Sequence, residues 1–341
     1  MIKNFFIYSL LLVTVFASCK KDVIWVPDDY GAAEVKKPEG PYVADKSFKS
    51  VAYCYHTNSI NTFDTAKLAY ITHIHFAFLN PQEGGTLQTL TNFANFEKLK
   101  NLAKEKGVKT AISLSGSELI YRTIAANEKT RKIFIKNIVD FAVRYGLDGI
   151  DLDWEYPRAN HGSDITFSLF MQELSAELHS WHKYLSMAVT AGLFAGPVKD
   201  GITPEAIAAV DFVNLMAYDG IGTDAANPNH HSSYNMAERV LNIWLTEKGL
   251  PKEKAILGVP LYGKNSANTA RTYVTLLADG ANANDDQFTV GGSTYYYNGI
   301  NTIKAKTTLA KTSGNGIMFW EFAQDARGAN SLLKAAYDAS R

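Results

Sequence analysis

The sequence has few cysteines, no excess of either charge and no apolar run long enough to cross a membrane. Its 341 residues contain two cysteines, Cys19 and Cys54, and 34 basic residues against 34 acidic ones. The charge balance gives no electrostatic reason to expect nucleic acid as a partner. Cys19 lies at a signal-peptide site that is described below, which leaves Cys54 as the only other cysteine. No intrachain disulfide is therefore expected in the mature chain. A membrane-spanning helix would need about 20 consecutive apolar residues.

The apolar run that is present lies near the N-terminus, from Phe5 to Phe16. Small residues follow it before Cys19, which resembles a bacterial lipoprotein signal in which the cysteine becomes the acylated N-terminus. We therefore expect residues 1–19 to be a lipoprotein-type signal peptide with Cys19 as the first mature residue. The protein would be exported and held at a membrane by this lipid anchor, with plain secretion as the alternative. Residues 20–47 are polar and contain three prolines, which predicts a flexible tether.

Beyond residue 47, short apolar segments alternate with longer amphipathic ones. The expected strands are Val51–Tyr55, Ile71–Leu79, Lys109–Ser113, Gly149–Glu155, Tyr184–Val189, Phe212–Tyr218, Ala255–Leu261 and Gly316–Trp320. The expected helices are Phe93–Lys106, Lys129–Tyr145, Asp164–Trp181, Met236–Lys248 and Ile300–Lys311. This alternation predicts an α/β fold, a (β/α)8 TIM barrel over residues 48–341. An open doubly wound sheet is disfavoured because no glycine-rich phosphate loop follows the first strand.

The stretch DGIDLDWEYP, at residues 148–157, concentrates acidic side chains on one expected strand. Asp151, Asp153 and Glu155 are spaced by two residues, so on a strand they point to the same face. Asp148 has the other parity and precedes a glycine, which indicates a turn. Buried carboxyl groups favour their neutral form, so we expect the row to share protons. Catalytic groups of barrels lie at the C-terminal strand ends, where Glu155 is placed.

Polar and aromatic residues also end other expected strands. Tyr218 and Asp219 lie in NLMAYDG, Tyr262 in GVPLYG and Trp320 in GIMFWEF. Tyr218 and Trp320 could be ordinary barrel filling, but both are placed at the predicted mouth rather than in mid-strand. Together these side chains offer hydrogen-bonding and stacking groups around one opening.

The acidic stretch resembles the catalytic motif Asp-Gly-x-Asp-x-Asp-x-Glu of glycoside hydrolase family 18, the chitinase-like enzymes. LMAYD is similar to the sixth-strand motif of that family, and Trp320 to the tryptophan that ends its eighth strand. ISLSG is similar to its third-strand Ser-x-Gly-Gly, with Ser113 as the serine and Ser115 in place of the first glycine. Residues 263–298 are too few for the full α+β insertion domain of many members, so at most a reduced insertion after the seventh strand is expected.

The resemblance implies a retaining mechanism in which the substrate assists, with neither a metal nor a cofactor. Glu155 would act first as the acid and then as the base, and Asp153 would hold the acetamido N–H while sharing a proton with Asp151. Tyr218 would bond the acetamido oxygen. The residues implied in shaping or binding the substrate site are Tyr53, Ser113, Met216, Asp219, Tyr262 and Trp320, of which Tyr53 and Ser113 would contact Asp151.

The expected function is endo-hydrolysis of β-1,4-linked N-acetylglucosamine glycans, chitin or its oligosaccharides, by a monomer. One alternative is an endo-β-N-acetylglucosaminidase that acts on N-glycans, although DLDWEYP is more similar to chitinases. Another is a surface protein that binds glycans without cutting them. Members of that last kind typically lack the glutamate or an inner aspartate, whereas all three carboxyl residues are present here.

Several other residues are interpreted as structural. His73 and His75 share a strand face, but no third ligand has a recognisable spacing, so no metal site is expected. The pair His230–His231 lies in an expected loop and is interpreted as exposed or at the cleft rim. The run Tyr295–Tyr297 is either a sugar-contacting loop or a half-buried strand. Core packing is expected for Cys54, Trp181 and Trp244.

Overall fold

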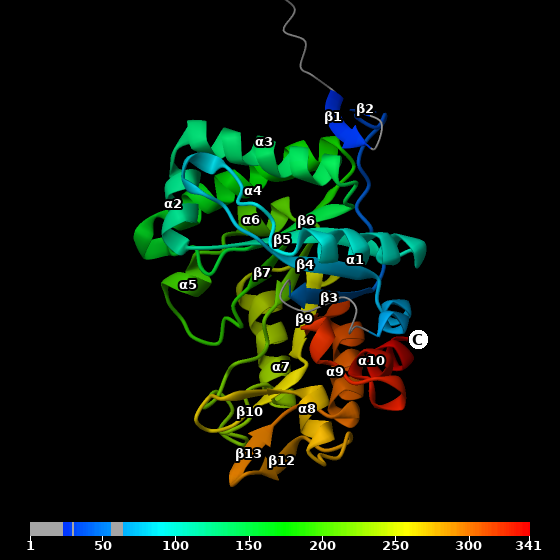
Figure 1. Cartoon of the computed structure of the whole chain (residues 1–341). Coiled ribbons are helices and arrows are strands. Elements are labelled where there is room, and N and C mark those ends of the chain that lie inside the picture. The colour runs from blue at the N-terminus through cyan, green and yellow to red at the C-terminus, as the bar shows by residue number, and fades with distance from the viewer. Residues whose placement is uncertain (1–22, 29–30, 56–63) are drawn as a thin grey trace, which may run out of the picture.

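The computed structural model describes residues 23–28, 31–55 and 64–341 and contains the predicted barrel (Figure 1). Eight parallel strands close in the order β14-β3-β4-β5-β6-β7-β8-β9. They are β3 (Lys49–Tyr55), β4 (His73–Leu79), β5 (Lys109–Ser115), β6 (Gly149–Asp153), β7 (Tyr184–Val189), β8 (Phe212–Leu215), β9 (Ala255–Pro260) and β14 (Gly316–Trp320). The predicted bounds of β7 and β14 are confirmed, and the others differ by a few residues at their ends.

Helices surround the strands, and the five predicted ones are present with similar bounds. The helices are α1 (Phe93–Glu105), α2 (Glu118–Ala126), α3 (Glu128–Arg144), α4 (Ser163–Ser180), α5 (Pro197–Asp200), α6 (Pro204–Ala209), α7 (Tyr234–Asn242), α8 (Tyr273–Ala278), α9 (Ile300–Ser313) and α10 (Leu332–Ser340). A π-helical turn, Ile243–Glu247, continues α7. None of the described helices combines the length and the apolar character that a membrane crossing needs.

The strand side chains alternate between the barrel interior and a layer under the helices. In β6, Leu152 belongs to the core between strands and helices, while Asp151 and Asp153 lie on the opposite face. Trp154 also packs outward, stacked on Tyr121 with 5.1 Å between ring centroids. The predicted separation of the acidic and apolar faces is therefore confirmed. The core positions expected for Cys54, Trp181 and Trp244 are confirmed as well, since all three are buried.

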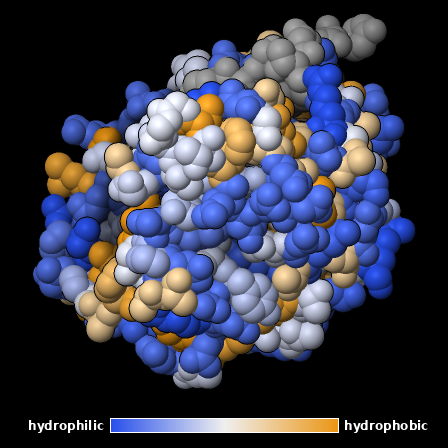
Figure 2. All heavy atoms as spheres, turned by 90° about the horizontal axis from the view of Figure 1, so that it is seen from below, coloured by the Kyte–Doolittle hydropathy of each residue, from blue (hydrophilic) through white to orange (hydrophobic). Residues whose placement is uncertain are grey.

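A small insertion lies between β9 and α9, as expected for a reduced one. Its strands β10 (Tyr262–Lys264), β11 (Ala270–Thr272), β12 (Gln287–Val290) and β13 (Ser293–Tyr296) form an antiparallel sheet in the order β11-β10-β13-β12, next to α8. Tyr295 and Tyr297 are buried there, and the Tyr297 hydroxyl donates to the carbonyl of Asn282 at 2.7 Å. This run is thus a half-buried strand. The face seen in Figure 2 is mainly hydrophilic, with scattered apolar residues.

The segment predicted as a tether, residues 20–47, is only partly described, and its second part contacts the barrel. β1 (Val23–Asp28) and β2 (Gly31–Lys36) pair as an antiparallel ribbon. Tyr42 stacks on His179, with ring centroids 4.1 Å apart, and its hydroxyl donates to Asp211 at 2.9 Å. The tether prediction is wrong for residues 37–47, because a few specific contacts dock this polar segment at the N-terminal ends of the strands. The predicted signal peptide and Cys19 lie outside the described residues.

We expect Tyr42→Ala to lower the free energy of unfolding by about 2 kcal/mol, since it removes an aromatic stack and a hydrogen bond to a carboxylate. Urea denaturation measures this change. Val43→Ala is the matched control, because Val43 is 81% exposed and its truncation should leave stability unchanged. Equal stability of Tyr42→Ala and the natural protein would show that the segment is a free tether after all.

Candidate active site

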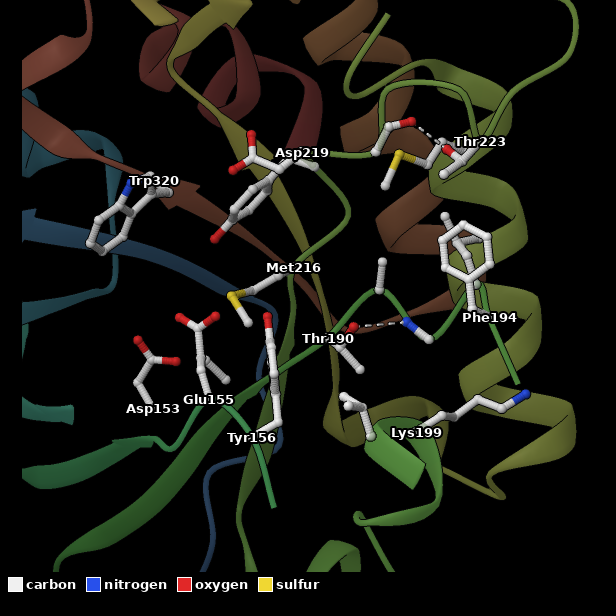
Figure 3. A pocket seen from close by; sticks show the side chains of 18 of the residues that line it. Asp153, Glu155, Tyr156, Thr190, Phe194, Lys199, Met216, Asp219, Thr223 and Trp320 are labelled. Carbon is white, nitrogen blue, oxygen red and sulfur yellow. Dashed lines mark hydrogen bonds between the residues drawn. The ribbon is translucent and has the colours of Figure 1, made fainter. Parts of the chain in front are cut away.

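A cavity of about 630 Å³ opens at the C-terminal ends of the barrel strands. Predicted site residues that line it are Tyr53, Asp153, Glu155, Met216, Tyr218, Asp219, Tyr262 and Trp320. Asp151 and Ser113 are fully buried on the neighbouring strands β6 and β5 and do not line the cavity. Figure 3 shows the carboxyl groups of Asp153 and Glu155 side by side at this opening, with Trp320 beyond them. The structure therefore brings all ten predicted residues to one place.

Asp151 is completely buried, yet donors surround its carboxyl group. The donors are Tyr53 OH at 2.8 Å and Ser113 Oγ at 2.7 Å to Oδ2, and Ser186 Oγ at 2.6 Å and Asn214 Nδ2 at 3.3 Å to Oδ1. His75 Nδ1 lies 3.6 Å from Oδ1, within ion-pair range. Burial alone would raise the pKa of Asp151, but the contact with His75 and the serine hydrogen bonds outweigh it and lower this pKa. Asp151 is therefore a carboxylate.

Asp153 lies two residues further along β6, and its pKa is shifted in the direction opposite to that of Asp151. It is 5% exposed, and its Oδ1 has no hydrogen-bond partner among the described residues. Burial, together with the negative charges of Glu155 and Asp151, raises the pKa of Asp153 well above its usual range. This shift favours the protonated form of Asp153. Neighbouring carboxyl groups whose environments push their pKa values apart are typical of acid–base sites.

Glu155 lies just beyond the strand rather than at its last residue, which corrects the predicted bounds of β6. Pairing with β5 ends at Asp153, opposite Ser115, and pairing with β7 ends at Leu152. Because no strand partner extends further, Glu155 lies outside the ladder and is exposed to the cavity. It can therefore reach a bound molecule while it stays next to Asp153.

Asp219 faces the acidic row from the other side of the cavity. Its Oδ1 accepts from Tyr262 OH at 2.7 Å, lies 2.8 Å from Lys264 Nζ and is 3.3 Å from His231 Nδ1. Partial burial would raise the pKa of Asp219, but contacts with His231, Lys264 and Tyr262 lower it to about 2. Asp219 is consequently a fixed negative charge, held by two elements that are distant in sequence.

Tyr218 and Trp320 complete the centre of the cavity. Burial, then the neighbouring carboxyl group of Asp153, raises the pKa of Tyr218 well above its usual range, so its hydroxyl stays protonated and can donate. The Trp320 ring stacks on Phe78 with centroids 5.7 Å apart, and it lies 5.7 Å from the Tyr53 ring. This packing holds the indole as a rigid apolar surface beside the carboxyl groups.

The cavity also extends away from the carboxyl groups, into a part that the sequence did not indicate. This extension is called the second arm. It runs along residues 190–196, between β7 and α5, to Phe194 and Lys199 (Figure 3). The Phe194 side chain is 76% exposed, which is unusual for a large apolar residue. No strand-end argument finds it, because it lies in the middle of a loop. The arm gives the site room for more than one ring of a substrate.

The sequence missed several residues that support the site. Ser186 and Asn214 were detectable, because each is a polar residue on the inward face of an apolar strand. His75 was considered only as a metal ligand, but it faces Asp151, and the described residues hold no group of three or more side chains suited to a metal. Of the two interpretations of His230–His231, solvent exposure is wrong, since their exposed fractions are 7% and 0%. His231 instead lies behind the cavity wall, in contact with Asp219 and Tyr262. Each histidine bonds a backbone carbonyl of the insertion, that of Tyr297 for His230 and that of Tyr262 for His231. No local sequence pattern reveals such partners.

A (β/α)8 barrel with coupled carboxyl groups at its mouth is the arrangement of a glycoside hydrolase. The chain belongs to glycoside hydrolase family 18, because the family model described as "Glycosyl hydrolases family 18" matches residues 49–325. The resemblance inferred from DGIDLDWEYP is thereby confirmed.

Curated relatives and solved structures agree with this membership. Chitinase 1 of Aphanocladium album is 26% identical over 341 aligned positions, covering 78% of each chain. Among solved structures, a family 18 chitinase of Flavobacterium johnsoniae has 29% identity and a TM-score of 0.73, covering 87% of this chain and 94% of its own. A chitinase of Bacteroides thetaiotaomicron has 26% identity and a TM-score of 0.74, covering 86% and 97%. A chitinase-like agglutinin of Robinia pseudoacacia, at 23% identity, shares the fold.

Proposed function

We propose that this protein hydrolyses β-1,4-linked N-acetylglucosamine glycans, chitin or its oligosaccharides, by a substrate-assisted retaining mechanism. It cuts the glycan at internal bonds rather than from its end. The observation that carries the proposal is the row of three carboxyl groups that rises to the cavity. Hydrogen-bond donors surround buried Asp151, buried Asp153 has an Oδ1 without a partner among the described residues, and Glu155 is exposed to the cavity. A non-catalytic binding site has no need for such a row, which is costly to bury. The chitinase relatives support the same substrate class.

When the substrate binds, the proton held by Asp153 passes to the neighbouring Glu155, which leaves Asp153 as a carboxylate. In the first step, Glu155 donates this proton to the glycosidic oxygen as the bond between that oxygen and C1 breaks. The carbonyl oxygen of the substrate's own acetamido group forms a new bond to C1, which gives a cyclic oxazolinium ion. Asp153 accepts the acetamido N–H and, as a carboxylate, balances the positive charge. Tyr218 donates its hydroxyl proton in a hydrogen bond to the acetamido oxygen and orients it for attack.

In the second step, the Glu155 carboxylate takes a proton from a water molecule that attacks C1 from the side the leaving group vacated. The bond between C1 and the acetamido oxygen breaks, and the product keeps the configuration of the substrate. The proton that Glu155 took from water then returns to Asp153, which restores the starting state. Asp151, held by its four donors, remains a carboxylate throughout and stabilises the proton on Asp153 when the substrate is uncharged. The indole of Trp320 supplies the apolar surface under the reacting ring.

The experiment that tests this function compares chitotetraose with a high-mannose glycopeptide at equal enzyme concentrations. We expect chitotetraose to be cut to shorter oligosaccharides and the glycopeptide to remain intact. Cleavage of the glycopeptide alone would assign the protein to N-glycan trimming. Binding of chitotetraose without cleavage would assign it to the non-catalytic, glycan-binding class, whose fold the Robinia agglutinin shares.

We also propose that the mature protein is a monomer exported to the cell envelope and anchored through an acylated Cys19. Two or more acyl chains would make this anchor stable, whereas one would hold it only weakly. Fractionation of cells is the measurement, and recovery of the native protein wholly in the soluble fraction would contradict the anchor.

A further inference from the structure

The catalytic residues that follow β8 lie in irregular backbone. β8 ends at Leu215, so Tyr218 and Asp219 are outside the strand ladder that holds the residues of β6. Asp219 has φ of +62°, a left-handed conformation that few non-glycine residues adopt and that costs about 1–2 kcal/mol per residue. Such a turn keeps its shape only when its surroundings hold it.

His231 holds this turn on its C-terminal side. The backbone N–H of Asp219 donates to His231 Nδ1 at 3.4 Å, and the N–H of Gly220 donates to the His231 carbonyl at 2.8 Å. His231 Nε2 lies 3.2 Å from the carbonyl of Tyr262, which can only accept, so Nε2 carries a proton and donates to it. His231 is completely buried, so water does not compete for these bonds.

Ser232 holds the same turn on its N-terminal side. Its hydroxyl donates to the carbonyl of Ala217 at 2.8 Å, directly before Tyr218. Lys306, buried in α9, donates to the Ser232 hydroxyl at 2.9 Å and to its carbonyl at 2.7 Å. Asn298 donates to the same carbonyl at 2.9 Å. The backbone on both sides of Tyr218 is therefore bonded to two consecutive buried residues.

We propose that His231 and Ser232 are positioning residues that fix Tyr218 and Asp219 for the reaction and connect them to the insertion. The inference rests on the proposed function of the site. The partners of His231 and Ser232 come from β10 at Tyr262, from Asn298 and from α9, so the insertion and the helix after it form the support behind this turn. Even a reduced insertion thereby acts on the catalytic centre, through bonds to the backbone rather than through contact with the substrate.

The test uses His231→Gln and Ser232→Ala, with His230→Gln as the matched control. His230 lies in the same loop, is buried and bonds an insertion carbonyl, that of Tyr297 at 2.9 Å, and it accepts from the Ser232 N–H. Among the described residues, the hydrogen bonds of His230 go to Tyr297, Ser232 and Asn227, not to residues 217–220. All three variants are expected to lose some stability, whereas only His231→Gln and Ser232→Ala should lose kcat, by about 10- to 100-fold with a nearly unchanged KM on chitotetraose.

A double variant that combines His231→Gln with Tyr218→Phe distinguishes a positioning role from a general loss of stability. If His231 acts through Tyr218, the double variant loses much less kcat than the product of the two single losses, while the losses in stability add. Multiplicative losses in kcat, an equal kcat loss in His230→Gln, or natural kcat in both His231→Gln and Ser232→Ala would each overturn the inference. Ser232→Ala is a small change and remains informative where His231→Gln does not fold.

The proposed function and this inference fail in distinguishable ways. If the natural protein cuts no N-acetylglucosamine glycan, the function fails. The inference is then judged by amide hydrogen exchange, because the N–H groups of Asp219 and Gly220 are bonded to His231. Faster exchange at these two residues in His231→Gln than in His230→Gln supports the positioning role, and equal exchange in the two variants contradicts it.

Discussion

Replacement of Glu155 by glutamine should abolish hydrolysis of chitotetraose while leaving its binding largely intact. The amide has the shape of the acid but cannot donate a proton to the leaving oxygen, and loss of general-acid help alone costs about 10²–10⁴ in rate. Glu155 lies beyond the strand ladder and is exposed to the cavity, so the substitution disturbs no packing. Initial rates measure the first quantity and isothermal titration calorimetry the second.

Glu118→Gln is a suitable control for this substitution. Glu118 opens α2 and contacts Arg122 and His161 rather than the cavity. Its replacement should leave kcat and KM unchanged. More than half of the natural turnover in Glu155→Gln would show that another group supplies the proton.

Asp153→Asn should lower kcat by about 10²–10³, the usual effect of removing one electrostatic group aimed at a developing charge. Asparagine resembles the protonated resting state of Asp153, so substrate binding should change little. It cannot become a carboxylate when the oxazolinium ion forms, so the loss should be in kcat rather than in KM. Steady-state kinetics on chitotetraose distinguish the two, and a loss confined to KM would contradict the assigned role.

The same substitution should stabilise the fold, increasingly so as the pH rises. Folding raises the pKa of Asp153 above its ordinary value of 3.8, so the unfolded chain releases this proton first as pH increases. The stability tied to Asp153 is therefore fully present below about pH 4 and is lost as pH rises through the folded pKa. Asparagine has no proton to lose. Asp153→Asn should thus exceed the natural protein in Tm at pH 8 and approach it at pH 4.

Asp148→Asn provides the matched control, directly before the same strand. Asp148 precedes β6 and accepts from Thr110 N at 2.8 Å and Thr110 Oγ1 at 3.1 Å, so its replacement removes hydrogen bonds to a carboxylate. It should lower Tm and leave kcat unchanged, the opposite of Asp153→Asn in both respects. A lower Tm for Asp153→Asn at pH 8 would show that Asp153 is ionised in the resting protein.

The barrel and the acidic row could be predicted because both depend on local periodicity. Alternation in DGIDLDWEYP places Asp151 and Asp153 on the face opposite Leu152, and the strand ladder then keeps that order. Trp320 was placed correctly for the same reason, since it ends a short apolar strand. The predicted end of β6, at Glu155, was wrong. The strand ends at Asp153 because its hydrogen-bonded pairing with β5 and β7 extends no further.

Contacts between distant segments could not be predicted in this way. Lys264 and His231 reach Asp219 from β10 and from the loop before α7, and neither residue stands out in its own stretch of sequence. Tyr42 docks onto His179 across more than a hundred residues, although its surroundings are those of a linker. Such partners are fixed by tertiary packing, which leaves no local periodic pattern.

The configuration of the first product tests the central claim, that the substrate's acetamido group attacks C1, most directly. Chitotetraose hydrolysis can be followed by proton NMR within the first minutes, before the anomers equilibrate, beside a fully de-N-acetylated tetramer. The account predicts that the β-anomer forms first and that the de-N-acetylated tetramer is not cut. Initial release of the α-anomer, or comparable cleavage of the tetramer without acetyl groups, would contradict it.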